Sequence, residues 1–327
     1  MRERAQIRLL RDGRRLHLHD GPIDLIVEAF GAVGEIDAAY RAAAQRFVTV
    51  LDELCSELPL LREPARSGGP RVSGVIARRM VAAVAPYGDW TFITPMAAVA
   101  GAVAEEILGT MTSAASLSRA YVNDGGDIAL HLGPGERFVV GMVERPDRPS
   151  LFGAATLDST QPVRGIATSG WRGRSFSLGI ADAVTVLADR AAQADAAATV
   201  IANAVDLPGH AGIIRVRARD LAPDSDLGDR LVTQEVGELS DEDVCAALHA
   251  GLMVARMLAS EGLIHSAALR LRGETRIVGI TPEMDSALKF DQLVDKPYPI
   301  VNLGSESDEE SAVLPLSATA DPSLRSG

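Results

Sequence analysis

The sequence of 327 residues is poor in aromatic residues and in cysteine. Tryptophan, tyrosine and phenylalanine make up 4% of the chain, whereas 47% of all residues are hydrophobic. A sizeable hydrophobic core is therefore expected, and it must be built from Ala, Val, Leu and Ile. The two cysteines, Cys55 and Cys245, stand far apart, which excludes a disulfide framework and a Cys-x-x-Cys metal site.

The sequence also lacks an excess of basic charge and a long hydrophobic run. Its 32 Lys and Arg residues stand against 44 Asp and Glu residues, which gives a net charge of −12. This acidity argues against a general nucleic-acid binder, because such proteins need cations against phosphate. The N-terminus shows no signal-peptide core, and no uncharged stretch reaches the roughly 18 residues of a membrane span. We therefore expect a cytoplasmic protein with neither a nucleic-acid nor a membrane partner.

The hydrophobic pattern predicts strands and helices that do not strictly alternate, which is typical of an α+β fold. Strands are expected over residues 6–10, 15–19, 23–29, 90–93, 119–122, 128–132, 137–143, 163–168, 183–187, 213–216, 266–271 and 275–280. Helices are expected over residues 36–58, 72–84, 191–204 and 241–258, with a further one starting at Thr94-Pro95.

The organisation along the chain indicates one domain over residues 1–304. Residues 62–71 are rich in turn formers and predict a flexible linker inside it. Residues 305–327 are acidic and then rich in Pro, Ser and Ala, which predicts a disordered tail. Ser240 is placed as an N-cap, with Asp243 in the capping-box position.

The first segment that could carry chemistry is Asn123-Asp124-Gly125-Gly126-Asp127, directly after a predicted strand. Two adjacent glycines let the backbone turn sharply and present N–H groups to a ligand. Asp127 could then bind a hydroxyl or a cation. A tight hairpin turn without any ligand explains the same residues, so both interpretations stay open.

The second segment, over residues 166–179, concentrates hydroxyls, arginines and glycines between two hydrophobic strands. Such donors suit a phosphate or carboxylate group. We expect Arg172 and Arg174 to hold the anion, and Ser169 and Ser175 to orient it. The segment is not a P-loop, because Gly-Lys-Ser/Thr is missing. A plain hairpin loop is the alternative.

The third segment places Asp195 and Thr199 four residues apart, hence on one face of a predicted helix. Alanines surround both residues and leave a ligand room to approach. A carboxylate and a hydroxyl, completed by waters and a ligand phosphate, suit a hard cation such as Mg²⁺. The alternative is that Asp195 merely belongs to the opening turn of the helix, while Thr199 bonds back to a carbonyl.

Together the three segments resemble the ApbE family, the flavin transferases that move FMN from FAD onto a protein threonine. The match consists of Asn123 to Asp127 as an Asn-x-Gly-Gly-Asp turn, Thr168-Ser169-Gly170 as a strand end, residues 184–188 as a Val-Thr-Val-x-Ala strand, and residues 194–199 as an Ala-Asp-Ala-x-x-Thr helix. The resemblance covers roughly residues 94–205. It implies a T-fold-related domain of mixed sheets with packed helices, Mg²⁺ near Asp195 and Thr199, and a ligand pocket at the Gly125-Gly126 turn.

The sequence departs from that family between residues 175 and 182. Where the flavin transferases have a His-x-x-Asp-Pro-x-Thr-Gly loop, this chain has neither histidine nor proline. The chain also offers few aromatic residues to stack on a flavin ring. Both observations argue against FAD or FMN as the ligand, and they indicate an uncharacterised cytoplasmic branch of ApbE-like proteins.

The leading hypothesis is an enzyme, a transferase or hydrolase, that acts on a small anionic or phosphate-bearing ligand. Asp127, Asp182 and Ser169 are the expected catalytic residues, and Asp195 with Thr199 the expected metal ligands. The ligand would be bound by Asn123, Gly125, Gly126, Thr168, Gly170, Arg172, Arg174 and Ser175. An FAD pyrophosphatase or FMN transferase and a non-catalytic small-molecule binding protein remain as alternatives. A homo-oligomer is also expected, and the small residues of 97–104 could serve its interface.

Overall fold

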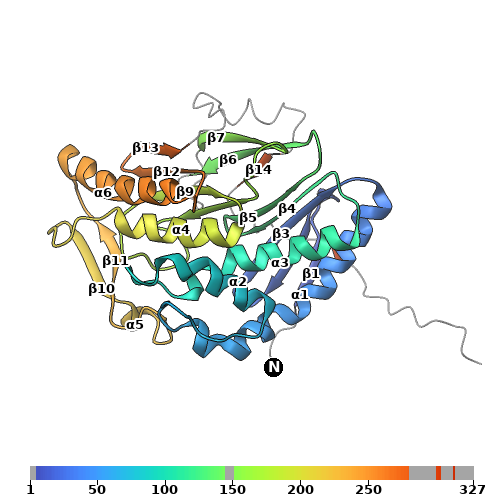
Figure 1. Cartoon of the computed structure of the whole chain (residues 1–327), viewed down its shortest axis with the longest axis horizontal. Coiled ribbons are helices and arrows are strands. Elements are labelled where there is room, and N and C mark those ends of the chain that lie inside the picture. Colours follow the sequence, from blue (N-terminus) through green and yellow to red (C-terminus); the bar gives the residue numbers. More distant parts are fainter. Residues whose placement is uncertain (1–4, 144–150, 280–299, 303–311, 314–327) are drawn as a thin grey trace, which may run out of the picture.

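The structure, a computed structural model, describes residues 5–143, 151–279, 300–302 and 312–313, which form a large sheet with helices packed on one face (Figure 1). The sheet has ten strands in the order β13-β12-β9-β8-β5-β4-β3-β2-β1-β15, and every neighbouring pair is antiparallel. The strands are β1 (Gln6–Leu9), β2 (Leu16–Asp20), β3 (Ile23–Phe30), β4 (Arg119–Asp124), β5 (Asp127–Leu132), β8 (Gly165–Ser169), β9 (Ala183–Ala188), β12 (Ser266–Leu271), β13 (Glu274–Gly279) and β15 (Ala312–Val313).

Five helices cover one face of this sheet, with α4 near the centre of the layer (Figure 1). They are α1 (Val33–Leu61), α2 (Val75–Val84), α3 (Val99–Ala114), α4 (Ala191–Ala204) and α6 (Asp241–Ser260). The core between helices and sheet consists mainly of Ala, Val, Leu and Ile, with few aromatic residues among them. The composition predicts this kind of core, and small side chains allow the layers to approach closely.

A second, smaller core lies on the other face of the sheet. There β6 (Arg137–Val143), β7 (Leu151–Asp158) and β14 (Ile300–Asn302) form a separate three-stranded sheet. Phe138 from β6 packs edge to face against Tyr121 of β4, with the ring centroids 6.0 Å apart. Ile128, Leu130 and Leu157 belong to the same cluster. The helices and the small sheet thus enclose the centre of the large sheet from both sides.

A two-stranded sheet, β10 (Ile213–Arg217) and β11 (Leu231–Val236), stands beside the helix layer with the short helix α5 (Ala218–Leu221). Thr233 of β11 fixes the segment between β8 and β9. Its N–H donates to the Ser177 carbonyl at 2.9 Å, and its hydroxyl donates to the Gly179 carbonyl at 2.8 Å. The loop that begins at Trp171 is therefore anchored at its far end.

The mixed fold with packed helices confirms the expected fold class. The structure also confirms the capping box at Ser240 and Asp243. The expected strand over residues 90–93 is wrong, because the N–H groups of Trp90 and Thr91 both bond to the Tyr87 carbonyl and close a turn. The sequence pattern predicts none of the strands β7, β11, β14 and β15. The predicted tail lies outside the described residues, apart from β15.

One helix in the described part of the chain, α6, is long and apolar enough to cross a membrane by length and composition alone. Its inner side buries Val244, Leu248 and Leu252 in the main core. It packs on α4, β12 and β13. α6 is therefore a core helix of this α/β fold.

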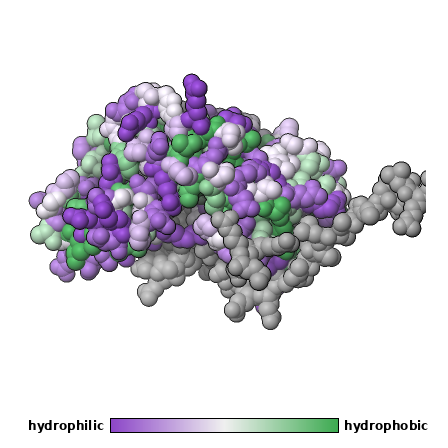
Figure 2. Space-filling model, turned by 90° about the horizontal axis from the view of Figure 1, so that it is seen from below, coloured by the Kyte–Doolittle hydropathy of each residue, from purple (hydrophilic) through white to green (hydrophobic). Residues whose placement is uncertain are grey.

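The small side of α3 is used inside the chain. Gly101 lies so close to the start of α4 that a Cβ atom there would overlap the Ala191 carbonyl. Ala98, Ala102 and Ala104 are buried as well. These residues are therefore not free to form a homodimer interface. On the face seen in Figure 2, hydrophobic residues form small patches between hydrophilic ones.

We expect Gly101→Ala to destabilise the protein by about 1–3 kcal/mol, because the added methyl would push α3 and α4 apart. Gly109→Ala on the same helix is the matched control. Gly109 is exposed and a Cβ there meets nothing within 4 Å, so alanine should stabilise by about 0.5–1 kcal/mol. Urea unfolding of the two variants measures both effects. A neutral Gly101→Ala would contradict the close approach.

Candidate functional site

The β4–β5 hairpin closes in a tight turn at Gly125 and Gly126. Their φ angles are +64° and +118°, in the region that favours glycine. The Asn123 side-chain oxygen accepts a hydrogen bond from the Gly126 N–H at 2.9 Å. This is the expected turn chemistry, and it places Asp124 and Asp127 at the two ends of the turn.

Arg174 lies against this turn, although it comes from the segment between β8 and β9. A Cβ atom on Gly125 would overlap the Nη2 atom of Arg174, so the missing side chain is what leaves room for the guanidinium. The charge of Arg174 partly opposes the burial that raises the pKa of Asp124 and Asp127. The structure thus brings the first two predicted segments together, with Arg174 exposed to solvent.

Three carboxylates influence one another near this turn, and the charge of Arg174 acts on two of them, Asp124 and Asp127. Asp124 is buried, and its burial, together with the charge of Asp127, raises its pKa to about 8. Burial raises the pKa of Asp127 well above its ordinary value, and the charge of Asp195 adds to this. The pKa of Asp195 is raised by burial and by Asp124. The three groups therefore disfavour one another's ionised forms, and the third predicted segment joins the first two.

Asp195 also has a structural task. Its Oδ2 atom accepts a hydrogen bond from the Gly101 N–H in the first turn of α3, at 3.0 Å. In the alternative interpretation Asp195 merely belongs to the opening turn of its own helix. The structure supports this in part, because Asp195 does bind a helix start, but it is the start of the neighbouring helix α3. Thr199 lies one turn further along α4 and is half-buried.

Two threonines connect the site to the centre of the sheet. The Thr168 N–H donates to Asp127 Oδ1 at 3.3 Å. The hydroxyls of Thr168 and Thr185 share a hydrogen bond of 2.9 Å. Thr185 is buried in β9 and holds Thr168 in place. Ser169 follows Thr168 at the end of β8 and is half-buried.

Arg172 and Asp182 belong to a separate cluster. The Arg172 guanidinium stacks on the Trp171 ring, 4.1 Å from its centroid, and its Nε atom lies 3.6 Å from Asp182 Oδ1. Asp182 also accepts hydrogen bonds from the Trp171 indole at 3.3 Å and from the Arg272 N–H at 2.6 Å. Gly170 lies close to the Asp182 carbonyl. Arg172 and Asp182 thus pair with each other, while Arg174 lies against Gly125. Ser175 is exposed in the same loop.

The donor set fits a hard cation only with help from a ligand. In the described ranges, no three His, Cys, Asp or Glu side chains are arranged to hold a metal ion by themselves. A cation at Asp127 and Asp195 would therefore need oxygen atoms from water, a ligand or Thr199. Mg²⁺ is commonly bound in this way, through one or two carboxylates and substrate phosphates.

Sequence reasoning missed three residues of this arrangement. Asp124 stands inside the Asn-Asp-Gly-Gly-Asp motif, so its position next to Gly125 could have indicated it. Thr185 is the threonine of the Val-Thr-Val strand. Glu105 gave no signal beyond its charge, yet its Oε1 atom accepts a hydrogen bond from the Ala192 N–H at 2.8 Å.

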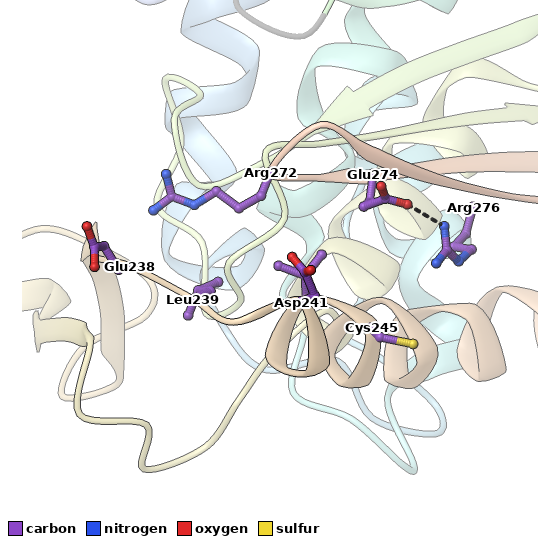
Figure 3. Close-up of a pocket in the computed structure, with 8 residues that line it drawn as sticks. Glu238, Leu239, Asp241, Cys245, Arg272, Glu274 and Arg276 are labelled. Carbon is purple, nitrogen blue, oxygen red and sulfur yellow. Dashed lines mark hydrogen bonds and ion pairs between the residues drawn. The ribbon is translucent and has the colours of Figure 1, made fainter.

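A separate cleft of about 660 Å³ opens between the first turns of α6 and the β12–β13 hairpin (Figure 3). Its arginines are engaged with neighbours: Arg276 pairs with Glu274 at 3.1 Å, and Arg272 donates to the Val236 and Gly237 carbonyls. Cys245 faces the same cleft from α6. None of the sequence-predicted site residues lines it.

Helices layered on an antiparallel sheet, with carboxylates and an arginine at a glycine turn, define an α+β protein with a polar site at the end of a hairpin. The chain belongs to the family described as AbpE bacteria, whose model matches residues 7–277. This membership confirms the resemblance found in the sequence motifs.

Curated proteins of Methanopyrus kandleri and Methanococcoides burtonii are similar to part of the chain. A UPF0280 protein of Methanopyrus kandleri is 40% identical over 137 residues, which are 42% of this chain and 50% of that protein. A UPF0280 protein of Methanococcoides burtonii is 39% identical over 140 residues, 42% of this chain and 55% of that protein. The chain thus spans about half the length of the curated relatives it matches.

Two solved structures are similar at low identity. An ApbE protein of Thermotoga maritima is 13% identical, with a TM-score of 0.43 over 84% of this chain and 96% of that one. A variant of the flavin transferase ApbE from Vibrio cholerae is 12% identical, with a TM-score of 0.44 over 81% of this chain and 96% of that one. Family membership rests on the family model, which covers most of the chain.

Proposed function

We propose that this protein is an enzyme that acts on a small phosphate-bearing molecule at the site of Asp124, Asp127, Asp195 and Arg174, with Mg²⁺ as its cofactor. The observation that carries the proposal is the Arg174 guanidinium on a bare glycine turn, where its charge acts on Asp124 and Asp127 and where the charge of Asp195 reaches Asp127. Crowded carboxylates are unfavourable without counter-charge, so such a site favours a bound cation.

The residues divide into three roles under this proposal. Asp127 and Asp195 would hold Mg²⁺, which would supply positive charge beside the phosphate oxygens. Arg174 would donate hydrogen bonds to the phosphate, since a guanidinium matches it in a bidentate way. Asp124 keeps a proton near neutral pH because burial raises its pKa to about 8, so it could donate that proton to the ligand.

Calorimetric titration with Mn²⁺, in the presence and absence of inorganic pyrophosphate, tests the proposal. We expect Mn²⁺ to bind, and to bind more tightly with pyrophosphate present, because each ligand supplies charge that the other needs. Asp127→Asn should weaken Mn²⁺ binding by about tenfold or more. Asp195→Asn should do the same while it keeps an acceptor for the Gly101 N–H.

Asp189→Asn is the control for this titration, since Asp189 is exposed and pairs with His265. It should leave Mn²⁺ binding unchanged. No Mn²⁺ binding with pyrophosphate present would contradict the proposal, and so would unchanged binding by Asp127→Asn.

Incubation with FAD and Mg²⁺ separates the proposal from the flavin alternative, which requires release of AMP. Binding without turnover of any diphosphate would instead favour the non-catalytic alternative. Cytoplasmic location and homo-oligomerisation stay predictions.

A further inference from the structure

Helices α3 and α4 both begin without a cap of their own. The residues before them, Ala98 and Arg190, make no side-chain hydrogen bond to the helix. The first N–H groups of any helix have no partner inside it and need an acceptor from elsewhere. In this protein one N–H in the first turn of each helix donates to a carboxylate of the other helix.

The two helices exchange carboxylates. Glu105 of α3 accepts a hydrogen bond from the Ala192 N–H at the start of α4, at 2.8 Å. Asp195 of α4 accepts one from the Gly101 N–H at the start of α3, at 3.0 Å. We call this pair of contacts, made by Glu105 and Asp195, the reciprocal cap.

The helical spacing explains why both acids reach across. Gly101 touches the Ala191 carbonyl, where a Cβ atom would overlap it. Glu105 follows Gly101 by four residues, and Asp195 follows Ala191 by four residues. In a helix, residues four apart lie on the same face. Each acid therefore stands one turn beyond the contact point, within reach of the other helix's first turn.

Glu105 is itself held by neighbouring charges. The Arg79 guanidinium of α2 lies with its Nε atom 3.6 Å from Glu105 Oε2. Arg79 also pairs with Glu106, which binds Arg46 of α1 at 2.7 Å. The side chain of Glu105 is 13% exposed. Its orientation is thus fixed from both sides, by Arg79 and by the start of α4.

We propose that Glu105 is a positioning residue for Asp195: by holding the start of α4 against α3, it sets the Asp195 carboxylate against Asp127. Glu105 touches neither cation nor ligand and acts through the reciprocal cap. The inference rests on the proposed function, since it concerns the affinity of the same cation site. Under this inference Glu105, a residue of the helix layer, contributes to the affinity of the cation site.

The test compares Mn²⁺ affinity in three variants. Glu105→Ala removes the acceptor for the Ala192 N–H and should weaken Mn²⁺ binding by about tenfold or more, as the loss of an orienting partner does at metal sites. Glu105→Gln keeps an acceptor oxygen and should restore most of the affinity. Glu106→Ala is the control, because this substitution removes the ion pairs with Arg46 and Arg79 but no contact to α4. Its Mn²⁺ affinity should stay within about twofold of the unmodified protein.

Each result of this comparison supports or contradicts either the inference or the proposed function. Binding by the unmodified protein and by Glu105→Ala with equal affinity contradicts this inference and leaves the proposed function standing. Absence of binding by the unmodified protein contradicts the proposed function itself. An equal loss in Glu105→Ala and Glu106→Ala would show a general loosening of α3 and overturn the positioning role. If Glu105→Ala does not fold, Glu105→Asp withdraws the acceptor by one methylene, and unchanged affinity in that variant also overturns the inference.

Discussion

Asp124→Asn is expected to stabilise the ligand-free protein at pH 8 and to leave its stability unchanged near pH 4. Asp124 is buried beside Asp127, and these two influences raise its pKa to about 8. Asp195 is close enough for the two charges to interact, while Arg174 and the Asp24 N–H lower the pKa. The replacement removes a buried charge that the fold accommodates poorly.

The direction of the pH dependence follows from proton binding. In the unfolded chain the carboxyl of Asp124 ionises at its ordinary pKa of 3.8, whereas in the folded protein it keeps its proton to about pH 8. The folded state therefore binds more protons between these values. The free energy of unfolding should fall as the pH rises through this window, by up to about 1.4 kcal/mol per pH unit.

Urea unfolding at intervals from pH 4 to pH 9 measures this slope. Asp124→Asn should flatten it and give the larger gain at the alkaline end. Asp37→Asn is the control, since Asp37 is exposed on α1, and it should reproduce the slope of the unmodified protein. A stability that does not change between pH 5 and pH 8 in the unmodified protein would contradict the prediction.

Arg174→Ala is expected to weaken the binding of Mn²⁺ with pyrophosphate by about 100-fold, the loss expected for hydrogen bonds to a charged group. The variant should also be less stable at pH 8, because it loses the positive charge that favours the ionised forms of Asp124 and Asp127. Arg174→Lys keeps the charge without the planar fork and should lie between the two. Titration and urea unfolding measure the two effects separately.

The position of Arg174 can be tested from the turn as well. Gly125→Ala would place a methyl group where the guanidinium lies, so it should weaken pyrophosphate binding in the same direction. Gly135→Ala is the matched control: Gly135 also has a positive φ, of +80°, but a Cβ there meets nothing within 4 Å. The control carries the backbone strain alone. Equal pyrophosphate binding by both glycine variants would show that Arg174 does not bind the ligand.

Much of the fold follows from local pattern. Helix α4 begins and ends at the predicted residues, because its run of alanines has no competing strand signal. The strand expected at Trp90 failed, since the sequence Pro86-Tyr87-Gly88 continues into a turn that local hydrophobicity does not reveal. Strand β11 was missed because its pairing with β10 depends on partners 14 to 23 residues earlier.

The sequence motifs predict which segments form the site, but not how their side chains pair. The glycine turn, Arg174 and Asp195 all lie where the three segments place them, and the structure brings them together. What the sequence cannot show is where each arginine lies. Arg172 and Arg174 are two residues apart, yet one pairs with Asp182 and the other lies against Gly125. That choice depends on the path of a loop anchored by Thr233.

The reciprocal cap has a consequence for the order of folding. Its two hydrogen bonds join residues that are 87 and 94 positions apart in the chain. Neither helix start can be completed until the strands between α3 and α4 have paired and brought both ends together, and such long-range contacts are slow to form. The two helix starts should therefore close late and open as one unit. The cation site should therefore also form late, because Asp195 reaches its final position only when the two helix starts close.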